Sequence, residues 1–225
     1  MTSKTKKAPL ARETIVEVDA TVFRNVLGFA AVADIRYYLN GVHVRAHERP
    51  LLMASDGHIA YCEEDRYGKA IVDVTLNISR TAKPFLKSGY RVIVEASRDE
   101  AGKAIEDGSS LRIVDRDEAT VYIEPRKAVI ACKYPDIPAV MGDFTTWDEG
   151  LLGGFNTRLL NRALALPGCV RFYHRGGDTN GSALFTFEPE RTGRHGIGLV
   201  MPMSGKPLVE VLPAALQADA LRAAA

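Results

Sequence analysis

Residues 14–32, TIVEVDATVFRNVLGFAAV, change their hydrophobic period at a single position, and this change indicates the fold. Up to Val18 the apolar side chains are typical of a short strand, whereas after Asp19 they recur at helical spacing. Asp19 itself is a residue type that commonly caps a helix N-terminus. The stretch therefore predicts a strand that leads directly into a helix over about residues 20–32.

The chain continues outward from this unit in a repeated pattern. Residues 36–62 predict three strands, with a two-residue hairpin turn at Asn40-Gly41 and a second turn at Ser55-Asp56-Gly57-His58. The order of one strand, one helix and three strands recurs over residues 70–125 and, in a shorter form, over 151–203. The copies share the pattern but almost no residue identities. We therefore predict an α+β protein built from repeated βαβββ half-domains, with helices on one face of antiparallel sheets.

Composition places the chain in the globular class. It has 225 residues, 46% of them apolar and 25% charged, and its formal net charge is +1. No apolar run is long enough for a membrane span, and the basic segment 1–13 has no apolar stretch behind it, so we expect a disordered tail and no secretory signal. The three cysteines, Cys62, Cys132 and Cys169, are far apart, which favours a reducing cytoplasmic location.

Positive charge gathers on the predicted helices. The segments 20–33, 79–88 and 157–166 hold six cationic residues and no acid, although the whole chain has a net charge of only +1. Such a surface suits a polyanion, and in the absence of a recognition-helix or zinc-finger motif the contacts would be to phosphates and independent of sequence. The alternative is that short surface helices carry these cations without a nucleic-acid role.

Other chemistries have weaker support in the sequence. Asp56 and His58 could form a hydrolytic pair, but Asp-Gly-His is also ordinary turn chemistry. His43 and His47 share a strand face and could ligate a metal, but Arg45 lies between them. No phosphate-binding loop of the GxxxxGK[ST] type occurs. We therefore expect neither an enzyme nor a cofactor.

Short motifs, in order along the chain, resemble the bacterial sliding clamp family (the DNA polymerase III beta subunit). Arg36-Tyr37-Tyr38-Leu39-Asn40-Gly41 and Ala54-Ser55-Asp56-Gly57-His58 are similar to the middle clamp domain, and Tyr134-Pro135-Asp136 resembles the segment that closes it. Phe155-Asn156 followed by TRLLNRALAL resembles the start of the second half of the last domain, and 199–203, LVMPM, resembles the family's C-terminal V-M-P-M.

The resemblance implies a fold and two kinds of site. Clamp domains are pairs of βαβββ halves whose basic helices line a hole for duplex DNA, which slides through without being read. The resemblance also implies a pocket that takes short apolar peptides of polymerases and other clamp-binding proteins, lined by Leu39, Ser55, Gly57, His58, Leu199, Met201, Pro202 and Met203. The residues expected to face DNA lie on the basic helices and in the RYY segment: Arg24, Tyr37, Tyr38, Arg80, Lys83, Lys87, Arg158 and Arg162.

This sequence also departs from the family pattern. Ile59-Ala60 stands where Arg-Leu is usual, and Val32-Ala33 replaces polar residues before the RYY segment. We expect a two-half domain over 14–136, a connector over 137–150, a third half over 151–205 and a helical tail over 206–225, in which Gln217–Leu221 is similar to the Gln-x-x-Leu peptides that enter clamp pockets.

The number of halves bears on the assembly and the function. Clamp rings contain twelve halves, so chains of three halves would have to self-associate, most simply by pairing two third halves. The sequence thus favours a processivity factor that assembles around duplex DNA. The alternative is a clamp-like module that does not encircle DNA and instead recruits or competes for replication proteins.

Overall fold

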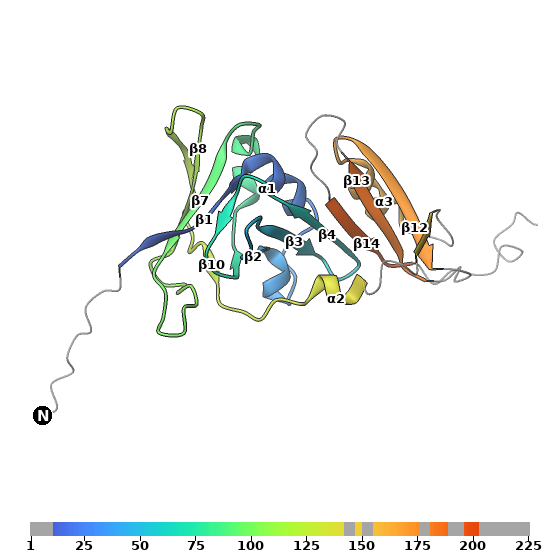
Figure 1. Ribbon diagram of the computed structural model, residues 1–225, viewed down its shortest axis with the longest axis horizontal. Helices are drawn as coiled ribbons and strands as arrows, with labels where there is room; N and C mark the ends of the chain where they lie inside the picture. The colour runs from blue at the N-terminus through green and yellow to red at the C-terminus, as the bar shows by residue number, and fades with distance from the viewer. Residues whose placement is uncertain (1–10, 142–146, 150–154, 176–180, 189–195, 203–225) are drawn as a thin grey trace, which may run out of the picture.

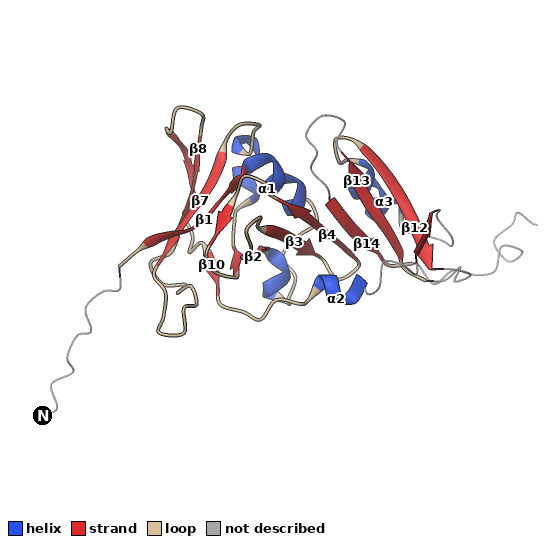
Figure 2. Cartoon of the chain, viewed as in Figure 1, coloured by secondary structure: helices blue, strands red, loops and turns tan. Residues whose placement is uncertain are grey.

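The computed structural model describes residues 11–141, 147–149, 155–175, 181–188 and 196–202, and every statement below concerns these residues. They form two antiparallel sheets and a few short helices, as Figures 1 and 2 show, which confirms the predicted fold class. Of the tail expected over 1–13, residues 1–10 lie outside the described residues, whereas Glu13 already belongs to the first strand; the tail expected over 206–225 lies wholly outside them. None of the described helices is long and apolar enough to cross a membrane.

The first two halves are interlocked. The first half contains β1 (Glu13–Asp19), α1 (Ala20–Leu27), η1 (Tyr37–Asn40), β2 (Val42–Arg45), β3 (Leu51–Ser55) and β4 (Ile59–Glu64), followed by the short β5 (Lys69–Ala70). The second contains β6 (Val74–Leu76), η2 (Arg80–Phe85), β7 (Arg91–Ala96), β8 (Ser110–Val114), β9 (Thr120–Ile123) and β10 (Val129–Ile130). β1 pairs with β7 and β6 pairs with β2, so the leading strand of each half joins the other half's sheet. The two halves therefore form one domain.

The helices begin where the sequence predicts and end earlier. The Asp19 side chain accepts the amides of Thr21 and Val22, at 2.7 and 3.2 Å, and so caps α1. The helix buries Val22 and Phe23 and ends at Leu27, five residues before the predicted end. The second predicted helix is a 3-10 turn with Pro84 inside it, because proline lacks the amide needed to continue an α-helix.

The expected hairpin turn at Asn40-Gly41 is wrong. Residues 37–40 form the 3-10 helix η1, and Gly41 has an extended backbone with φ of −115°. A Cβ at Gly41 would lie 2.6 Å from the carbonyl oxygen of Leu76 in the neighbouring strand. Glycine is needed here because two backbones approach closely, and not because the chain turns.

The third half extends the sheet of the first. It contains α3 (Thr157–Leu164), β12 (Cys169–Arg175), β13 (Ala183–Glu188) and β14 (Gly196–Val200), preceded by α2 (Ile137–Met141) and β11 (Trp147–Glu149) in the predicted connector. β14 pairs with β4 in an antiparallel register, and the result is a nine-stranded sheet that runs across both units (Figure 1). Unlike β1 and β6, the strand ahead of α3 stays in its own half, because β11 pairs with β12.

The nine-stranded sheet carries a core on each face. On β4, Ile59 and Tyr61 belong to the larger apolar cluster, which includes residues of α1, η2 and α3, whereas Ala60 and Cys62 belong to a smaller cluster. Alternate residues of a strand face opposite sides, so the smaller cluster lies on the other face of the sheet. Ile137 of α2 belongs to this smaller cluster, and the site described next lies beside it.

Candidate functional site

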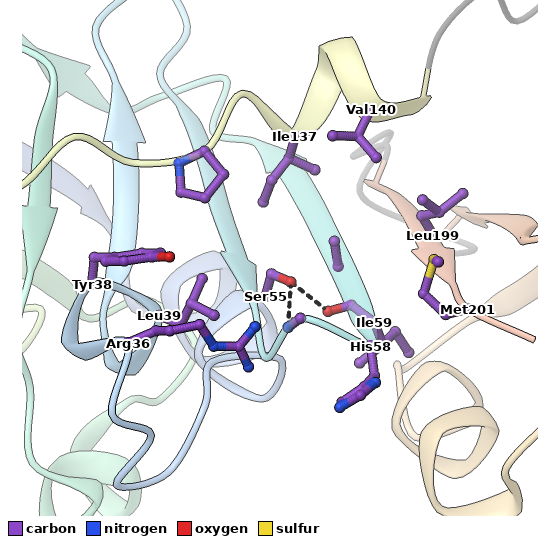
Figure 3. Close-up of a pocket in the computed structure, with 13 residues that line it drawn as sticks. Arg36, Tyr38, Leu39, Ser55, His58, Ile59, Ile137, Val140, Leu199 and Met201 are labelled. Atoms are coloured by element: carbon purple, nitrogen blue, oxygen red, sulfur yellow. Dashed lines mark hydrogen bonds between the residues drawn. The ribbon is translucent and has the colours of Figure 1, made fainter. Parts of the chain in front are cut away.

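A cavity of about 210 Å³ opens where the first half, the third half and the connector meet (Figure 3). Its walls come from η1, the β3–β4 turn, α2 and the end of β14. The lining residues are Arg36, Tyr38, Leu39, Ser55, Gly57, His58, Ile59, Ala60, Pro135, Ile137, Val140, Leu199 and Met201.

The β3–β4 turn forms the floor of the cavity between the two halves. The Ser55 hydroxyl donates to the carbonyl of Ile59 at 2.9 Å and accepts the amide of Gly57 at 3.0 Å, as the dashed lines in Figure 3 show. One carboxylate oxygen of Asp56 accepts the amides of His58 and Ile59, at 2.9 and 3.0 Å. Gly57 has a φ of +89°, which favours glycine. The predicted turn is therefore present and closely braced.

The wall on the first-half side is held by an ion pair and a backbone contact. Arg36 makes two side-chain hydrogen bonds to the Asp34 carboxylate, at 2.7 and 3.0 Å, and these lower the pKa of Asp34 to about 2. The same guanidinium donates to the carbonyl oxygen of Asp56 at 3.1 Å. Leu39 is buried at this wall, so the polar groups position an apolar lining.

The third half supplies the opposite wall. The amide of Met201 donates to the carbonyl oxygen of His58 at 2.8 Å, which joins the end of β14 to the turn. Leu199 is buried, whereas the Met201 side chain is 45% exposed at the mouth. The cavity therefore exists only when the third half is docked on the first.

The connector supplies a wall that the sequence analysis did not assign. Ile137 and Val140 lie along the upper side of the cavity in Figure 3, and Pro135 also lines the cavity. Behind them Tyr134 is buried and stacks on His43, with ring centroids 4.7 Å apart. The Tyr-Pro-Asp motif was the available signal for this wall, because it places an apolar segment directly after the two-half domain.

The structure brings most of the predicted pocket residues together. Six of them line the cavity: Leu39, Ser55, Gly57, His58, Leu199 and Met201. Pro202 follows on the chain but does not line it, and Met203 lies outside the described residues. Tyr38, one of the residues expected at the DNA, also lines this cavity.

The residues expected to face DNA divide into two groups. Lys83, Lys87 and Arg158 are exposed, Arg24 is half-buried on α1, and Tyr37 is 57% exposed. Arg80, which is also exposed, and Arg162, which is half-buried, make contacts within the fold that their sequence positions did not reveal.

Arg80 is held by the main chain of the first half. It donates to the carbonyl oxygens of Ala30 and Ala31, at 3.1 and 3.4 Å. Burial, followed by repulsion from Arg162, lowers the pKa of Arg80. Its cation therefore serves at least in part to hold the segment after α1.

The alternative sites receive no support from the described geometry. Both oxygens of Asp56 are engaged, in the turn and with Arg162, which is the arrangement of a turn cap. His43 shares a hydrogen bond with Thr75 at 3.1 Å, and burial lowers its pKa to about 4. The described residues contain no group of three or more potential metal ligands. Cys62 and Cys132 are free thiols, and burial raises the pKa of Cys62 to about 12.

Comparison with known proteins identifies the fold. No family model matches the sequence, and no curated protein matches it. Among solved structures, the Pseudomonas aeruginosa DNA polymerase sliding clamp matches with a TM-score of 0.58 and 17% identity, over 90% of this chain and 69% of that one. The Helicobacter pylori beta clamp, in complex with diflunisal, matches with a TM-score of 0.62 and 10% identity, over 88% and 69%. The Thermotoga maritima DNA polymerase III beta subunit matches with a TM-score of 0.56 and 13% identity, over 90% and 69%. The chain therefore has the fold of the bacterial sliding clamps.

Proposed function

We propose that this chain is a clamp-like processivity factor, which assembles around duplex DNA and holds replication or repair proteins through the cavity between its first and third halves. One observation carries the proposal. Residues between 36 and 201, far apart in the sequence, converge on one apolar cavity within a clamp fold. We propose no catalytic role, because Asp56 of the β3–β4 turn is engaged by two amides and Arg162, and the neighbouring Ser55 hydroxyl donates to the Ile59 carbonyl.

The cavity suits a short apolar peptide. Leu39, Ile137 and Leu199 offer fixed apolar surface, while Met201 is long, unbranched and exposed at the mouth. Such a side chain adapts to different occupants, which fits a site that serves several partners. A volume of about 210 Å³ takes one or two side chains, so an anchor residue would contribute most of the affinity.

The peptide site is tested with a fluorescein-labelled peptide that carries the Gln-x-x-Leu pattern, and with griselimycin, which the P. aeruginosa clamp binds. Fluorescence anisotropy should show saturable binding of the peptide, and griselimycin should compete for it. Leu199→Asp should abolish binding, because it places a charge on the cavity wall. Val32→Asp, at an exposed residue outside the cavity lining, is the matched control. Equal binding by both variants would contradict the assignment.

The proposed contact with DNA rests on the exposed cations of the helical segments. Lys83, Lys87 and Arg158 would contact phosphates without reading bases, which predicts strong dependence on salt. A sliding contact needs this property, because base-specific hydrogen bonds would stop the movement.

Encirclement is tested by the mass of the assembly and by DNA topology. Light scattering during size-exclusion chromatography should give a tetramer, the number of three-half chains that supplies twelve halves. Protein retained on closed circular DNA should be lost when the DNA is linearised, because a ring slides off free ends. A monomer that binds the two DNA forms equally would refute encirclement.

The non-encircling module remains a second candidate, and two observations favour it. Arg80 and Arg162 donate hydrogen bonds to backbone carbonyl oxygens of this chain, so these donors are not available to DNA phosphates. In addition, β11 pairs with β12 of the third half, in the position where β6 pairs with β2 in the two-half domain. The edge of β12 that another half would pair with is therefore already occupied. This candidate predicts a monomer or dimer that binds the labelled peptide but is not retained on circular DNA.

A further inference from the structure

We propose that Arg162 is a positioning residue of the cavity, which holds the β3–β4 turn in its binding shape from α3, and is not a DNA contact. The inference rests on the proposed peptide site and adds a residue that does not itself line the cavity. It also gives the two arginines of α3 different roles, because Arg162 would position the turn and Arg158 would contact DNA.

Three contacts fix the Arg162 side chain against the first half. Its Nε donates to the carbonyl oxygen of Gly28 at 3.0 Å, its guanidinium lies 5.4 Å from the ring centroid of Phe29, and its Nη1 pairs with Asp56. The Arg162 and Asp56 side chains are only 25% and 20% exposed. These contacts join α3 to the C-terminal end of α1 and to the turn, across 106 residues of sequence in the case of Asp56.

The two oxygens of Asp56 have different partners. Oδ1 accepts the amides of His58 and Ile59, and Oδ2 accepts Arg162. Burial raises the pKa of Asp56, but the two amides and Arg162 together outweigh burial, so this pKa lies below its ordinary value. The guanidinium therefore acts on the carboxylate that shapes the turn.

The turn carries Ser55, Gly57 and His58 into the cavity. The third half holds it at two points, because Met201 donates to the His58 carbonyl and Arg162 pairs with Asp56. Without Arg162, Asp56 would keep its two amides, but its second oxygen would lose its charged partner, and the turn would lose one of its two attachments to the third half.

Arg158 provides a matched control on the same helix. It lies one turn earlier, carries the same charge and is exposed, whereas Arg162 is half-buried. Arg162→Ala should weaken binding of the labelled peptide by about tenfold, an effect between those of a surface pair and a buried pair. Arg158→Ala should leave peptide affinity within about twofold and should lower DNA affinity instead.

Two further variants separate positioning from general destabilisation. Arg162→Lys should recover part of the peptide affinity, because lysine can pair with Asp56 but cannot also contact Gly28 and stack on Phe29 as a guanidinium does. In a double-mutant cycle with Asp56→Asn, the two losses should not add, because both variants remove the same contact.

Hydrogen exchange keeps the test independent of the peptide. Arg162→Ala should speed exchange of the amides of His58 and Ile59, while residues 91–96 of β7 stay protected as in the wild type. Failure of the wild type to bind the peptide would refute the proposed function, and exchange at the turn would still decide the role of Arg162. Unchanged exchange at 55–59, or equal peptide affinity in Arg162→Ala and wild type, would overturn the inference. A larger loss of DNA binding in Arg162→Ala than in Arg158→Ala would also overturn it.

Discussion

Replacing Gly198 by alanine should undo the junction between the first and third halves. Gly198 lies opposite Tyr61 of β4 on one side and opposite Phe185 of β13 on the other. An added Cβ would lie 2.1 Å from Cζ of Phe185 and 2.5 Å from the carbonyl oxygen of Ala60. Both distances are well below van der Waals contact, so something must move.

Neither neighbour can move cheaply. The Phe185 ring is stacked against Phe29 and Tyr61, with centroids 5.9 and 6.0 Å away, and the Ala60 carbonyl belongs to the backbone of the paired strand. Overpacking of this kind costs about 1–3 kcal/mol, and the backbone contact places the estimate for Gly198→Ala near 3 kcal/mol. At about 1.4 kcal/mol per factor of ten, docking of the third half would weaken by roughly a hundredfold.

The predicted change in stability for Gly198→Ala has the opposite sign to the usual effect of this substitution in extended backbone. Without a clash, glycine to alanine in extended backbone stabilises a protein by about 0.4–1 kcal/mol, because it restricts the unfolded chain. The clash predicts destabilisation instead, so the two explanations differ in direction as well as in size.

Urea unfolding measures the free-energy change, and hydrogen exchange locates it. Exchange should rise in residues 183–188 and 196–200 and stay unchanged in β7 and β8, and the labelled peptide should bind more weakly because Leu199 and Met201 leave the cavity. Ile197→Ala, next in the strand but on the opposite face, is the control and should keep the junction. A Gly198→Ala protein that is as stable as the wild type would refute the reasoning.

Three further predictions follow from other parts of the molecule. Burial holds the pKa of His43 at about 4, below the 6.5 of an unfolded histidine, so the unfolded chain binds more protons between these values. Stability should therefore fall by up to about 3 kcal/mol as the pH drops from 6.5 to 4, and His43→Gln should flatten this dependence in urea titrations; an unchanged slope would contradict it. Asp19→Ala should cost about 1 kcal/mol of unfolding free energy by removing the cap of α1, and Asp19→Asn should cost less; equal losses in the two variants would show that the cap is not responsible. Lys83→Ala with Lys87→Ala should reduce the slope of log affinity for DNA against log salt by roughly 1–2 and leave peptide affinity unchanged, whereas an unaltered slope would remove η2 from the DNA contact.

Local features were predictable from the sequence because their causes are local. The turn at 55–58 needs a glycine with positive φ and a side chain that caps its own neighbours, and Gly57 and Asp56 supply both. Asp19 caps α1 for the same reason, since its partners are two and three residues away. Alternation of apolar residues likewise located most of the strands.

Features that depend on a distant partner were not predictable. Asn40-Gly41 has the composition of a hairpin turn, but Gly41 is set by the approach of Leu76 from another strand. Arg158 and Arg162 are four residues apart and lie on the predicted helix, but the sequence could not show that Asp56 pairs with Arg162. The spacing of apolar residues predicts which side of a helix or strand is buried, whereas the contacts of its polar side chains depend on residues that are distant in the sequence.

The location of the cavity ties recognition to the integrity of the fold. Its walls include Leu39 from the first half and Leu199 from the third, and the turn between them is held by Arg162 and by the amide of Met201. An occupant that touches both walls binds only the docked arrangement, so occupancy stabilises docking by RT ln(1 + [L]/Kd). By the same linkage, anything that loosens α3 or β14 lowers the affinity for the occupant. A chain that bound its partners within one half would not have this dependence. Under the proposed function, the junction thus makes partner binding conditional on the continuous nine-stranded sheet.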